Sequence, residues 1–248
     1  MDNSSILNKN ENIISVGERV KMISNGKGLA WGSDSYLLAA RLRRGKKACE
    51  LGCGTGVVSL LAAAFEKFDH VCALEIEKES ADLAARNVAL NKLGERMAVH
   101  NIDIREARAD LLGGEFDCVF SNPPYFAHPG PESPDSIRQS ARHEIHGGIS
   151  DFCAAAFRLL KHGGRFYAVW RPDRLCDLFF AMRQNRLEPK IMTPVCATPK
   201  TPPSMVLVSA TKGGASGMKL TAPLILYREG TNELSDEAQK IYDTLSFE

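Results

Sequence analysis

The sequence predicts a doubly wound α/β fold, built on a mostly parallel sheet of seven strands of which one is antiparallel. From residue 47 onward, short apolar runs typical of strands alternate with segments of helical apolar periodicity, which indicates parallel strands covered by helices. A glycine cluster joins the first apolar run to the first helix, as is typical of such sheets. Prolines in residues 198–203 join the last two apolar runs and leave no room for a helix, so that pair is expected to be antiparallel.

Two elements are expected ahead of the sheet. Residues 1–12 are polar and are expected to be frayed. The pair Asn25-Gly26 lies between partly alternating segments, which predicts a β-hairpin. Residues 34–44 have the pattern of a short helix with leucines on one face, and Ser33 or Asp34 can cap it.

The core alternates strands and helices in a regular order. The expected strands are residues 48–51, 71–74, 97–100, 116–120, 165–169, 190–196 and 205–210. The expected helices are residues 57–65, 78–91, 150–160 and 173–184. The helix over 150–160 is expected to stop at His162-Gly163-Gly164, because glycine is favoured just after a helix C-terminus.

These elements divide the chain of 248 residues into three parts. Residues 1–32 are an N-terminal extension that holds the hairpin, residues 33–210 are the core domain, and residues 211–248 are a C-terminal extension. A strand near residues 224–227 and a short terminal helix are expected in the last part.

Composition limits the class of protein. The net charge of +1 gives no overall field that favours nucleic acid, so any basic footprint must be local. No apolar run has the length of a membrane-spanning helix and the first residues lack a signal peptide, so a cytoplasmic protein that does not bind membranes is expected. The seven cysteines include no Cys-x-x-Cys pair and are expected to be small buried hydrophobes. His143 and His146 lack a third ligand at suitable spacing, so no metal is expected.

A nucleoside-bearing cofactor is expected at the carboxyl ends of the first three strands. Gly52, Gly54 and Gly56 form a Gly-x-Gly-x-Gly turn, which lets the backbone bend sharply and a ligand approach closely. The turn lacks the glycine spacing of pyrophosphate binders and the Lys-Ser/Thr ending of a phosphate loop. Glu75 ends the second strand and can accept hydrogen bonds from a ribose diol, whereas Asp103 follows the third strand and can face an adenine amino group.

Two segments resemble a known family. Residues 50–56 resemble the cofactor loop of class I methyltransferases, and Ser121-Asn122-Pro123-Pro124-Tyr125 resembles the catalytic loop of their amino-methylating branch. The resemblance covers residues 15–210. It implies a Rossmann-like sheet, S-adenosylmethionine as methyl donor and S-adenosylhomocysteine as product. It also implies that Asn122 borders the cofactor. Glu50 can be a surface charge or can contact the methionine amino group.

The catalytic loop suits a planar amino group. The lone pair of such an amine is delocalised into the ring, so the amine is a poor nucleophile. The Asn122 side-chain carbonyl and the Pro123 backbone carbonyl can each accept one of its N–H groups, which favours pyramidalisation and stabilises the developing positive charge. Tyr125 offers a face on which a flipped base can stack. Neither a metal nor a covalent nucleophile is needed for this reaction.

Further segments resemble the bacterial tRNA adenine-N6 methyltransferases that act on adenine-37, beside the anticodon of a valine tRNA. Residues 32–40 resemble that family's Gly-Thr-Asp-x-x-Leu-Leu segment, with Ser33 in place of the usual Thr. The resemblance implies that Asp34 flanks the cofactor. Residues 138–144 resemble its Arg-x-x-Ala-Arg segment, and Arg138 and Arg142, four residues apart, can bind RNA phosphates from one helical face.

Other acceptors and roles stay open at this point. Protein glutamine-N5 methyltransferases share the loop but carry a sizeable helical domain in front, for which residues 1–32 leave little room. Guanine-N2 enzymes usually have Phe where this chain has Tyr125, and DNA enzymes need further recognition domains. A non-catalytic subunit that only binds S-adenosylmethionine has no need for amine-holding carbonyls. We therefore expect an enzyme that acts on tRNA or another RNA, with no obligate protein partner.

Overall fold

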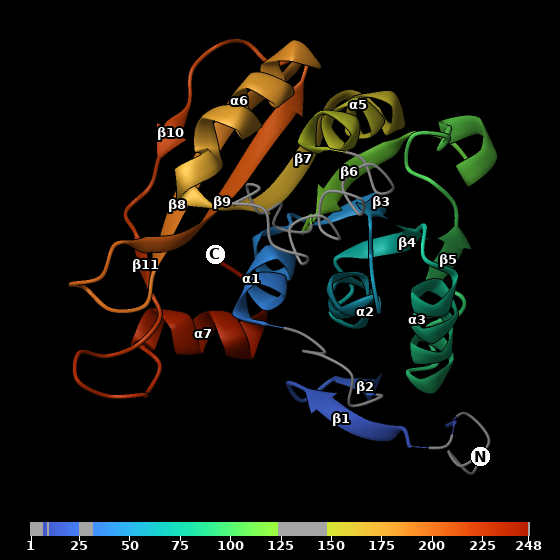
Figure 1. Cartoon of the computed structure of the whole chain (residues 1–248), viewed down its shortest axis with the longest axis horizontal. Coiled ribbons are helices and arrows are strands. Elements are labelled where there is room, and N and C mark those ends of the chain that lie inside the picture. Colours follow the sequence, from blue (N-terminus) through green and yellow to red (C-terminus); the bar gives the residue numbers. More distant parts are fainter. Residues whose placement is uncertain (1–6, 9, 25–31, 124–147, 248) are drawn as a thin grey trace, which may run out of the picture.

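The computed structural model describes residues 7, 8, 10–24, 32–123 and 148–247, and within these ranges a nine-stranded sheet forms the middle layer (Figure 1). The strands of this sheet are β3 (Gly45–Leu51), β4 (Phe68–Glu75), β5 (Met97–Asn101), β6 (Phe116–Ser121), β7 (Leu160–Trp170), β8 (Leu187–Cys196), β9 (Pro203–Lys212), β10 (Lys219–Leu220) and β11 (Leu224–Ile225). The helices are α1 (Ser33–Arg41), α2 (Val57–Ala64), α3 (Lys78–Leu90), α5 (Ile149–Leu159), α6 (Leu175–Gln184) and α7 (Asp236–Thr244), with short 3-10 turns η2 (Ala109–Leu112) and η3 (Pro172–Arg174).

The strand order is β10-β8-β9-β7-β6-β3-β4-β5, and β11 also pairs with β8. Strands β5, β4, β3, β6 and β7 are parallel, whereas β9 is antiparallel to both β7 and β8. The predicted fold class is therefore confirmed, including the reversed strand. The two-residue strands β10 and β11 extend the seven expected strands at the β8 edge.

Helices cover both faces of the sheet (Figure 1). Buried residues of α1, α2, α3 and α7 join one apolar cluster, and those of α5 and α6 join another on the opposite face. Helix α2 is apolar on nearly all sides, and Leu60 and Leu61 are fully buried. Each such leucine contributes roughly 1.5–3 kcal/mol through burial. This packing fixes the loops at the carboxyl ends of the strands.

The glycines after α5 have a different role from the predicted one. Helix α5 ends at Leu159, and Leu160 is already extended and pairs with Phe116 as the first residue of β7. The next pair along the two strands joins Cys118 to Arg165, so the extra residues of β7 form a bulge. Gly163 lies in this bulge with φ of 74°, a conformation that favours glycine. The predicted glycine cap is therefore wrong, because these glycines shape a strand.

The N-terminal hairpin is placed earlier in the chain than expected. Strands β1 (Asn12–Val16) and β2 (Val20–Ser24) pair antiparallel around a turn that contains Gly17, with φ of 62°. The Asn25-Gly26 pair lies outside the described residues. Strand β2 docks on α3, where the backbone N–H of Ile23 donates to Asn87 Oδ1 at 2.8 Å.

The C-terminal extension packs on the first helix of the core. The rings of Tyr36 in α1 and Tyr242 in α7 stack at 4.6 Å, and the Tyr36 hydroxyl donates to the backbone carbonyl of Tyr242 at 2.6 Å. Six of the seven free cysteines are buried, as expected, and Cys176 is exposed. In the described part of the chain, no helix has the length and apolarity needed to cross a membrane.

Candidate active site

The glycine turn lies between β3 and α2, at the carboxyl edge of the sheet. All three glycines have positive φ, and Gly56 precedes α2 with φ of 87°. A Cβ on Gly56 would meet Ala84 Cβ at 3.3 Å, so this glycine allows α2 to pack closely on α3. A Cβ on Gly54 would meet nothing within 4 Å, so the backbone at Gly54 borders open space. A ligand can therefore approach the main chain at Gly54, as predicted for a cofactor turn.

Glu75 lies directly against this turn. Its Oε2 accepts a hydrogen bond from the Gly54 backbone N–H at 2.7 Å, and its Oε1 accepts from the Glu77 backbone N–H at 2.9 Å. The residue is 7% exposed. A carboxylate has about four acceptor positions, so Glu75 retains capacity for two ligand hydroxyls. The structure thus brings the predicted ribose acceptor and the predicted glycine turn together.

Glu50 is buried beneath the turn, with its carboxylate facing the first turn of α2. Glu50 Oε2 accepts hydrogen bonds from the Ser59 backbone N–H at 3.0 Å and from the Ser59 hydroxyl. Burial raises the pKa of Glu50 to about 8, the two bonds from Ser59 oppose this shift, and the charge of Glu75 adds to it. Glu50 is therefore mostly protonated at neutral pH in the ligand-free protein.

Replacing Glu50 by glutamine is expected to flatten the pH dependence of stability. The folded protein holds a proton on Glu50 that the unfolded chain, with a pKa near 4.5, releases. The wild-type free energy of unfolding therefore falls as pH rises from 4.5 to 8, by up to about 1.4 kcal/mol per pH unit relative to Glu50→Gln. Thermal melting of both proteins from pH 5 to pH 8 measures this. The exposed Glu79→Gln is the control, and equal slopes for wild type and Glu50→Gln would contradict the buried proton.

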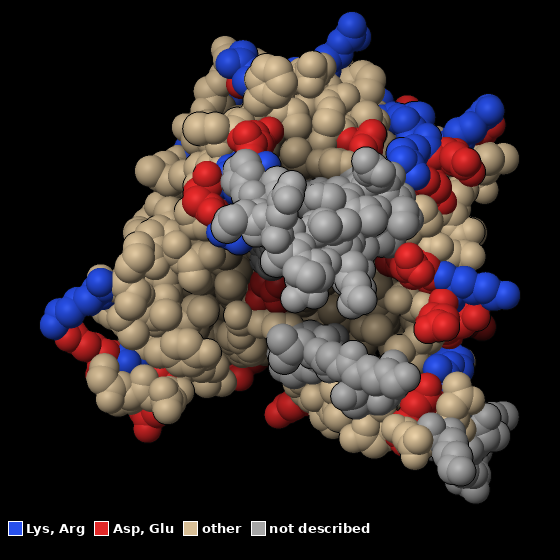
Figure 2. All heavy atoms as spheres, viewed as in Figure 1, with Lys and Arg blue, Asp and Glu red and all other residues tan. Residues whose placement is uncertain are grey.

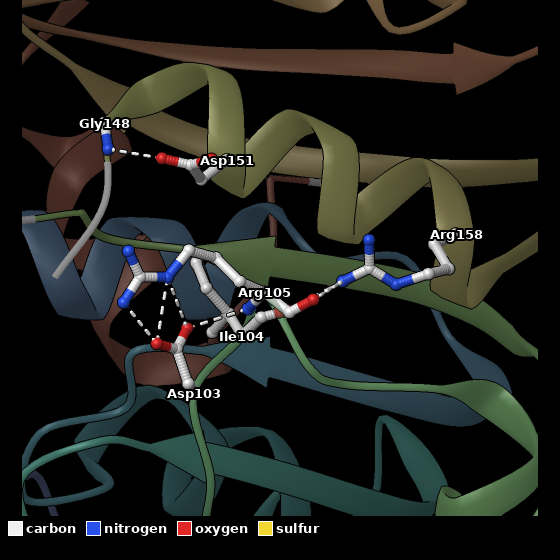
Figure 3. A network of polar contacts seen from close by, with 6 residues as sticks. All are labelled: Asp103, Ile104, Arg105, Gly148, Asp151 and Arg158. Atoms are coloured by element: carbon white, nitrogen blue, oxygen red, sulfur yellow. Dashed lines mark hydrogen bonds and ion pairs between the residues drawn. The ribbon is translucent and has the colours of Figure 1, made fainter.

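Asp103 follows β5, and its carboxylate is held by Arg105 (Figure 3). Arg105 Nε contacts both carboxylate oxygens at 2.9 and 3.0 Å, and the Arg105 backbone N–H donates to Oδ1 at 2.8 Å. Arg158 of α5 anchors the same loop through the Ile104 carbonyl at 2.7 Å. The loop also lies next to Glu75, whose backbone carbonyl accepts from the Ile102 N–H at 3.1 Å. The pairing of Asp103 with Arg105 was not anticipated from the sequence.

Asn122 follows β6 and is held by the start of α1. Its Nδ2 donates to Asp34 Oδ2 at 2.9 Å and to the Ser35 hydroxyl at 3.3 Å. A carboxylate only accepts hydrogen bonds, so the amide nitrogen must face Asp34 and the carbonyl oxygen Oδ1 must face away. That oxygen is buried and has no hydrogen-bond partner among the described residues. Such an oxygen costs about 1–3 kcal/mol when unpaired, so it is a strong candidate for accepting a ligand N–H.

The segment that carries Asp34 is adapted to this contact. Asp34 Oδ1 accepts from the Ser35 backbone N–H at 2.8 Å, which orients the carboxylate toward Asn122. A Cβ at position 32 would lie 2.6 Å from Asp34 Oδ1, so Gly32 leaves the space that the carboxylate occupies. In this structure Asp34 therefore positions Asn122, a contact that the prediction of a cofactor-flanking role did not include.

The structure describes only some of the remaining predicted site residues. Pro123 is buried beside Asn122, and the Ser121 hydroxyl donates to the Leu51 carbonyl at 2.7 Å, which ties the end of β6 to the glycine turn. Tyr125, Arg138 and Arg142 lie outside the described residues, as do Pro124, His143 and His146. Within the ranges that the structure describes, no three His, Cys, Asp or Glu side chains are grouped to hold a metal ion.

Sequence reasoning missed Asn87, which supports the cofactor turn. Its fully buried amide accepts from the Ile23 backbone N–H and donates to the Thr55 carbonyl at 3.0 Å. The hairpin is thereby linked to the turn. The available signal was a polar residue within the apolar face of α3. Such a residue is expected to be buried, and a buried amide needs hydrogen-bond partners.

Comparison with known proteins places this chain in a family. A family model described as "Methyltransferase small domain" matches residues 27–176, which is more than half of the chain. Two curated relatives are named tRNA1(Val) (adenine(37)-N6)-methyltransferase. The one from Porphyromonas gingivalis is 31% identical over 160 residues, covering 64% of this chain and 62% of the relative. The one from Bacteroides fragilis is 30% identical over 182 residues, covering 73% and 76%.

Solved structures share the fold. A crystal structure of a predicted O-methyltransferase, protein Atu636 from Agrobacterium tumefaciens, has a TM-score of 0.70 at 24% identity and covers 86% of this chain and 97% of that one. M. jannaschii TYW2 in complex with AdoMet has a TM-score of 0.55 at 14% identity and covers 82% and 86%. These likenesses show a shared fold. The matched family model confirms the resemblance seen in the sequence: the chain belongs to the methyltransferase small domain family.

Proposed function

We propose that this protein transfers a methyl group from S-adenosylmethionine to the exocyclic N6 amine of an adenine in RNA, with adenine-37 of a valine tRNA as the acceptor. The buried Asn122 Oδ1, unpaired within the described residues, is the observation that carries this proposal. An oxygen fixed in this way is ready to accept an N–H from a planar amine. The names of the relatives at about 30% identity support adenine and tRNA as the acceptor.

The residues around the glycine turn suit S-adenosylmethionine. The open space beside Gly54 admits a ligand to the backbone, and the Glu75 carboxylate borders that space with acceptor positions for a ribose diol. In this proposal Gly52, Gly56 and Asp103 complete the cofactor site, and Glu50 lies beneath it. S-adenosylmethionine supplies an electrophilic methyl group when bound.

The chain's own groups hold and activate the amine. Asn122 Oδ1 and the Pro123 carbonyl each accept one N–H, which draws electron density toward nitrogen and directs its lone pair at the methyl group. The amine nitrogen gains the methyl group and loses one proton to water, and S-adenosylhomocysteine is the other product. Asp34 keeps the Asn122 amide in the required orientation. We assign base stacking to Tyr125 and phosphate contacts to Arg138 and Arg142.

A labelled-methyl assay distinguishes the possible acceptors. The purified chain, incubated with radiolabelled S-adenosylmethionine, is expected to label unmodified bulk tRNA and to leave a peptide-chain release factor unlabelled. Activity of the pure chain alone also tests the alternative of a non-catalytic subunit. Labelling of the release factor and not of RNA would support a protein glutamine-N5 methyltransferase and overturn the RNA proposal.

A further inference from the structure

Apart from the open space beside Gly54, a second hollow, here called the second cavity, borders Asp34. It has a volume of about 560 Å³ and is formed by Asp34, by residues 171–173 after β7, and by residues 203–205 at the start of β9. Helix α1 contacts both β7 and β9, so the three segments converge at one place in the fold (Figure 1). The volume falls in the usual range for small-ligand sites.

The walls of this cavity are held in place. The Trp170 indole N–H donates to the Arg174 carbonyl at 2.7 Å, which fixes the turn that follows β7. Within the turn, Arg171 Nε and Nη2 donate to the two oxygens of Asp173 at 2.9 and 2.6 Å. This two-bond pairing fixes the plane of the Arg171 guanidinium. The adjoining wall is the start of β9, where Val206 pairs with Trp170 of β7 and Pro203 pairs with Cys196 of β8.

The lining has the chemistry of a nucleobase site. Pro172, Pro203 and Met205 offer apolar surface, and the Arg171 guanidinium offers a planar cation, both of which stack on base faces. Asp173, whose pKa is lowered mainly by its hydrogen bond with Arg171, offers a carboxylate that accepts from a base amino group. The charges of Arg171 and Asp173 offset each other, which suits a base better than a phosphate.

The distribution of charge on the surface gives a second reason to expect RNA recognition in a pocket. Figure 2 shows basic and acidic side chains interspersed on the described part of this face, so no broad basic patch there accounts for RNA binding. On this face, recognition of RNA by the described residues is therefore expected to depend on local pockets. The cavity includes Asp34 but, among the described residues, neither Asn122 nor Pro123 lines it. Because Asp34 also accepts from Asn122 at 2.9 Å, an occupant of this cavity would lie next to the residue that we assign to the acceptor amine.

We propose that this cavity, defined by Asp34, Arg171–Asp173 and Pro203–Met205, binds the base of a nucleotide adjacent to the acceptor adenine in the RNA. This inference rests on the proposed function, because it needs an RNA substrate. It gives the enzyme a preference for sequence context at a neighbouring position, with an amino-bearing base favoured. Asp34 forms part of both sites and keeps the two bases in fixed relation.

The test combines protein variants with abasic RNA. The substrate is an RNA stem-loop that contains the methylated adenine, with an abasic nucleotide placed on its 5′ or its 3′ side. For the wild type, one of the two abasic substitutions is expected to raise the KM for RNA about 10-fold with little change in kcat. Arg171→Ala is expected to raise the KM for intact RNA by a similar factor and to show no further loss on that abasic RNA.

Matched controls separate this effect from folding and from surface charge. Arg108, beside η2, makes the same kind of pair as Arg171. Its Nε and Nη2 donate to the two carboxylate oxygens of Asp110 at 3.1 and 2.8 Å. Arg108→Ala is therefore expected to behave as wild type on every RNA. Met205→Ala provides a second cavity variant, and Met218→Ala is its exposed control. Melting temperatures and S-adenosylmethionine affinity are measured for all variants. The affinity is expected to stay unchanged throughout, and the melting temperature in all but Met205→Ala, because Met205 packs against the core.

The outcomes are distinguishable. Two results would show that the cavity does not bind a base. In one, the increases in KM from Arg171→Ala and from the abasic site multiply. In the other, neither abasic substitution changes the KM of the wild type. In both cases this inference fails while RNA methylation stands. If the wild type labels no RNA at all, the proposed function fails first, and that result is visible without any variant.

Discussion

Asn122→Ala is expected to lower kcat for methyl transfer by roughly 100- to 1000-fold and to leave the affinity for S-adenosylmethionine unchanged. The variant lacks the buried carbonyl that we assign to the acceptor amine, whereas the glycine turn and Glu75 stay intact. Single-turnover methylation of RNA gives the rate, and isothermal titration with S-adenosylmethionine gives the affinity. A rate equal to that of wild type would refute the assigned role.

Stability gives an independent readout for the same variant. Asn122→Ala loses the hydrogen bonds to Asp34 and Ser35, but it also removes an oxygen that is buried without a described partner. The two effects oppose each other, so the melting temperature is expected to change little. Asn185→Ala is the matched control, because its amide only donates to the Ala181 carbonyl near the end of α6. That variant is expected to keep full activity.

Asp34→Ala is expected to lower kcat by roughly 10- to 100-fold through misorientation of Asn122. The amide nitrogen of Asn122 loses its acceptor at 2.9 Å, so the carbonyl is no longer held away from α1. The same variant is expected to raise the KM for RNA, since Asp34 also lines the second cavity. The affinity for S-adenosylmethionine is expected to stay constant, because in this structure Asp34 contacts Asn122.

The conservative variant tests positioning against loss of fold. Asp34→Asn retains a side-chain carbonyl that can accept from Asn122 Nδ2, so it is expected to recover part of the activity lost in Asp34→Ala. A weakened affinity for S-adenosylmethionine with unchanged kcat would instead support the cofactor-flanking role that the sequence suggested. Equal loss in both Asp34 variants, with lowered melting temperatures, would indicate a purely structural role.

Local patterns in the sequence were sufficient for most of the sheet. Strands β3 to β9 and the helices between them follow apolar periodicity, and the glycine turn is read from adjacent residues. The bulge at Gly163 was misread because a glycine with positive φ serves equally well after a helix or inside a bulged strand. The hairpin was placed too late because the turn at Gly17 carries a weaker signal than Asn25-Gly26.

The site was only partly predictable, for a physical reason. Residue types and their order indicated the glycine turn, Glu75 and Asn122, since each ends or follows a strand. The side chain of Asn122 is held by Asp34, which is 88 residues away in the chain. Only the packing of α1 against the sheet brings the two residues together. The proton on Glu50 likewise depends on burial, which no local pattern reports. The second cavity joins three distant segments and left no sequence signal.

Mapping the labelled nucleoside tests the central claim most directly. tRNA methylated by the purified wild-type chain is digested to nucleosides and analysed by mass spectrometry, with Asn122→Ala run in parallel. The account predicts that the label appears as N6-methyladenosine with wild type and is absent with the variant. Label in another nucleoside, or N6-methyladenosine formed equally by Asn122→Ala, would contradict it.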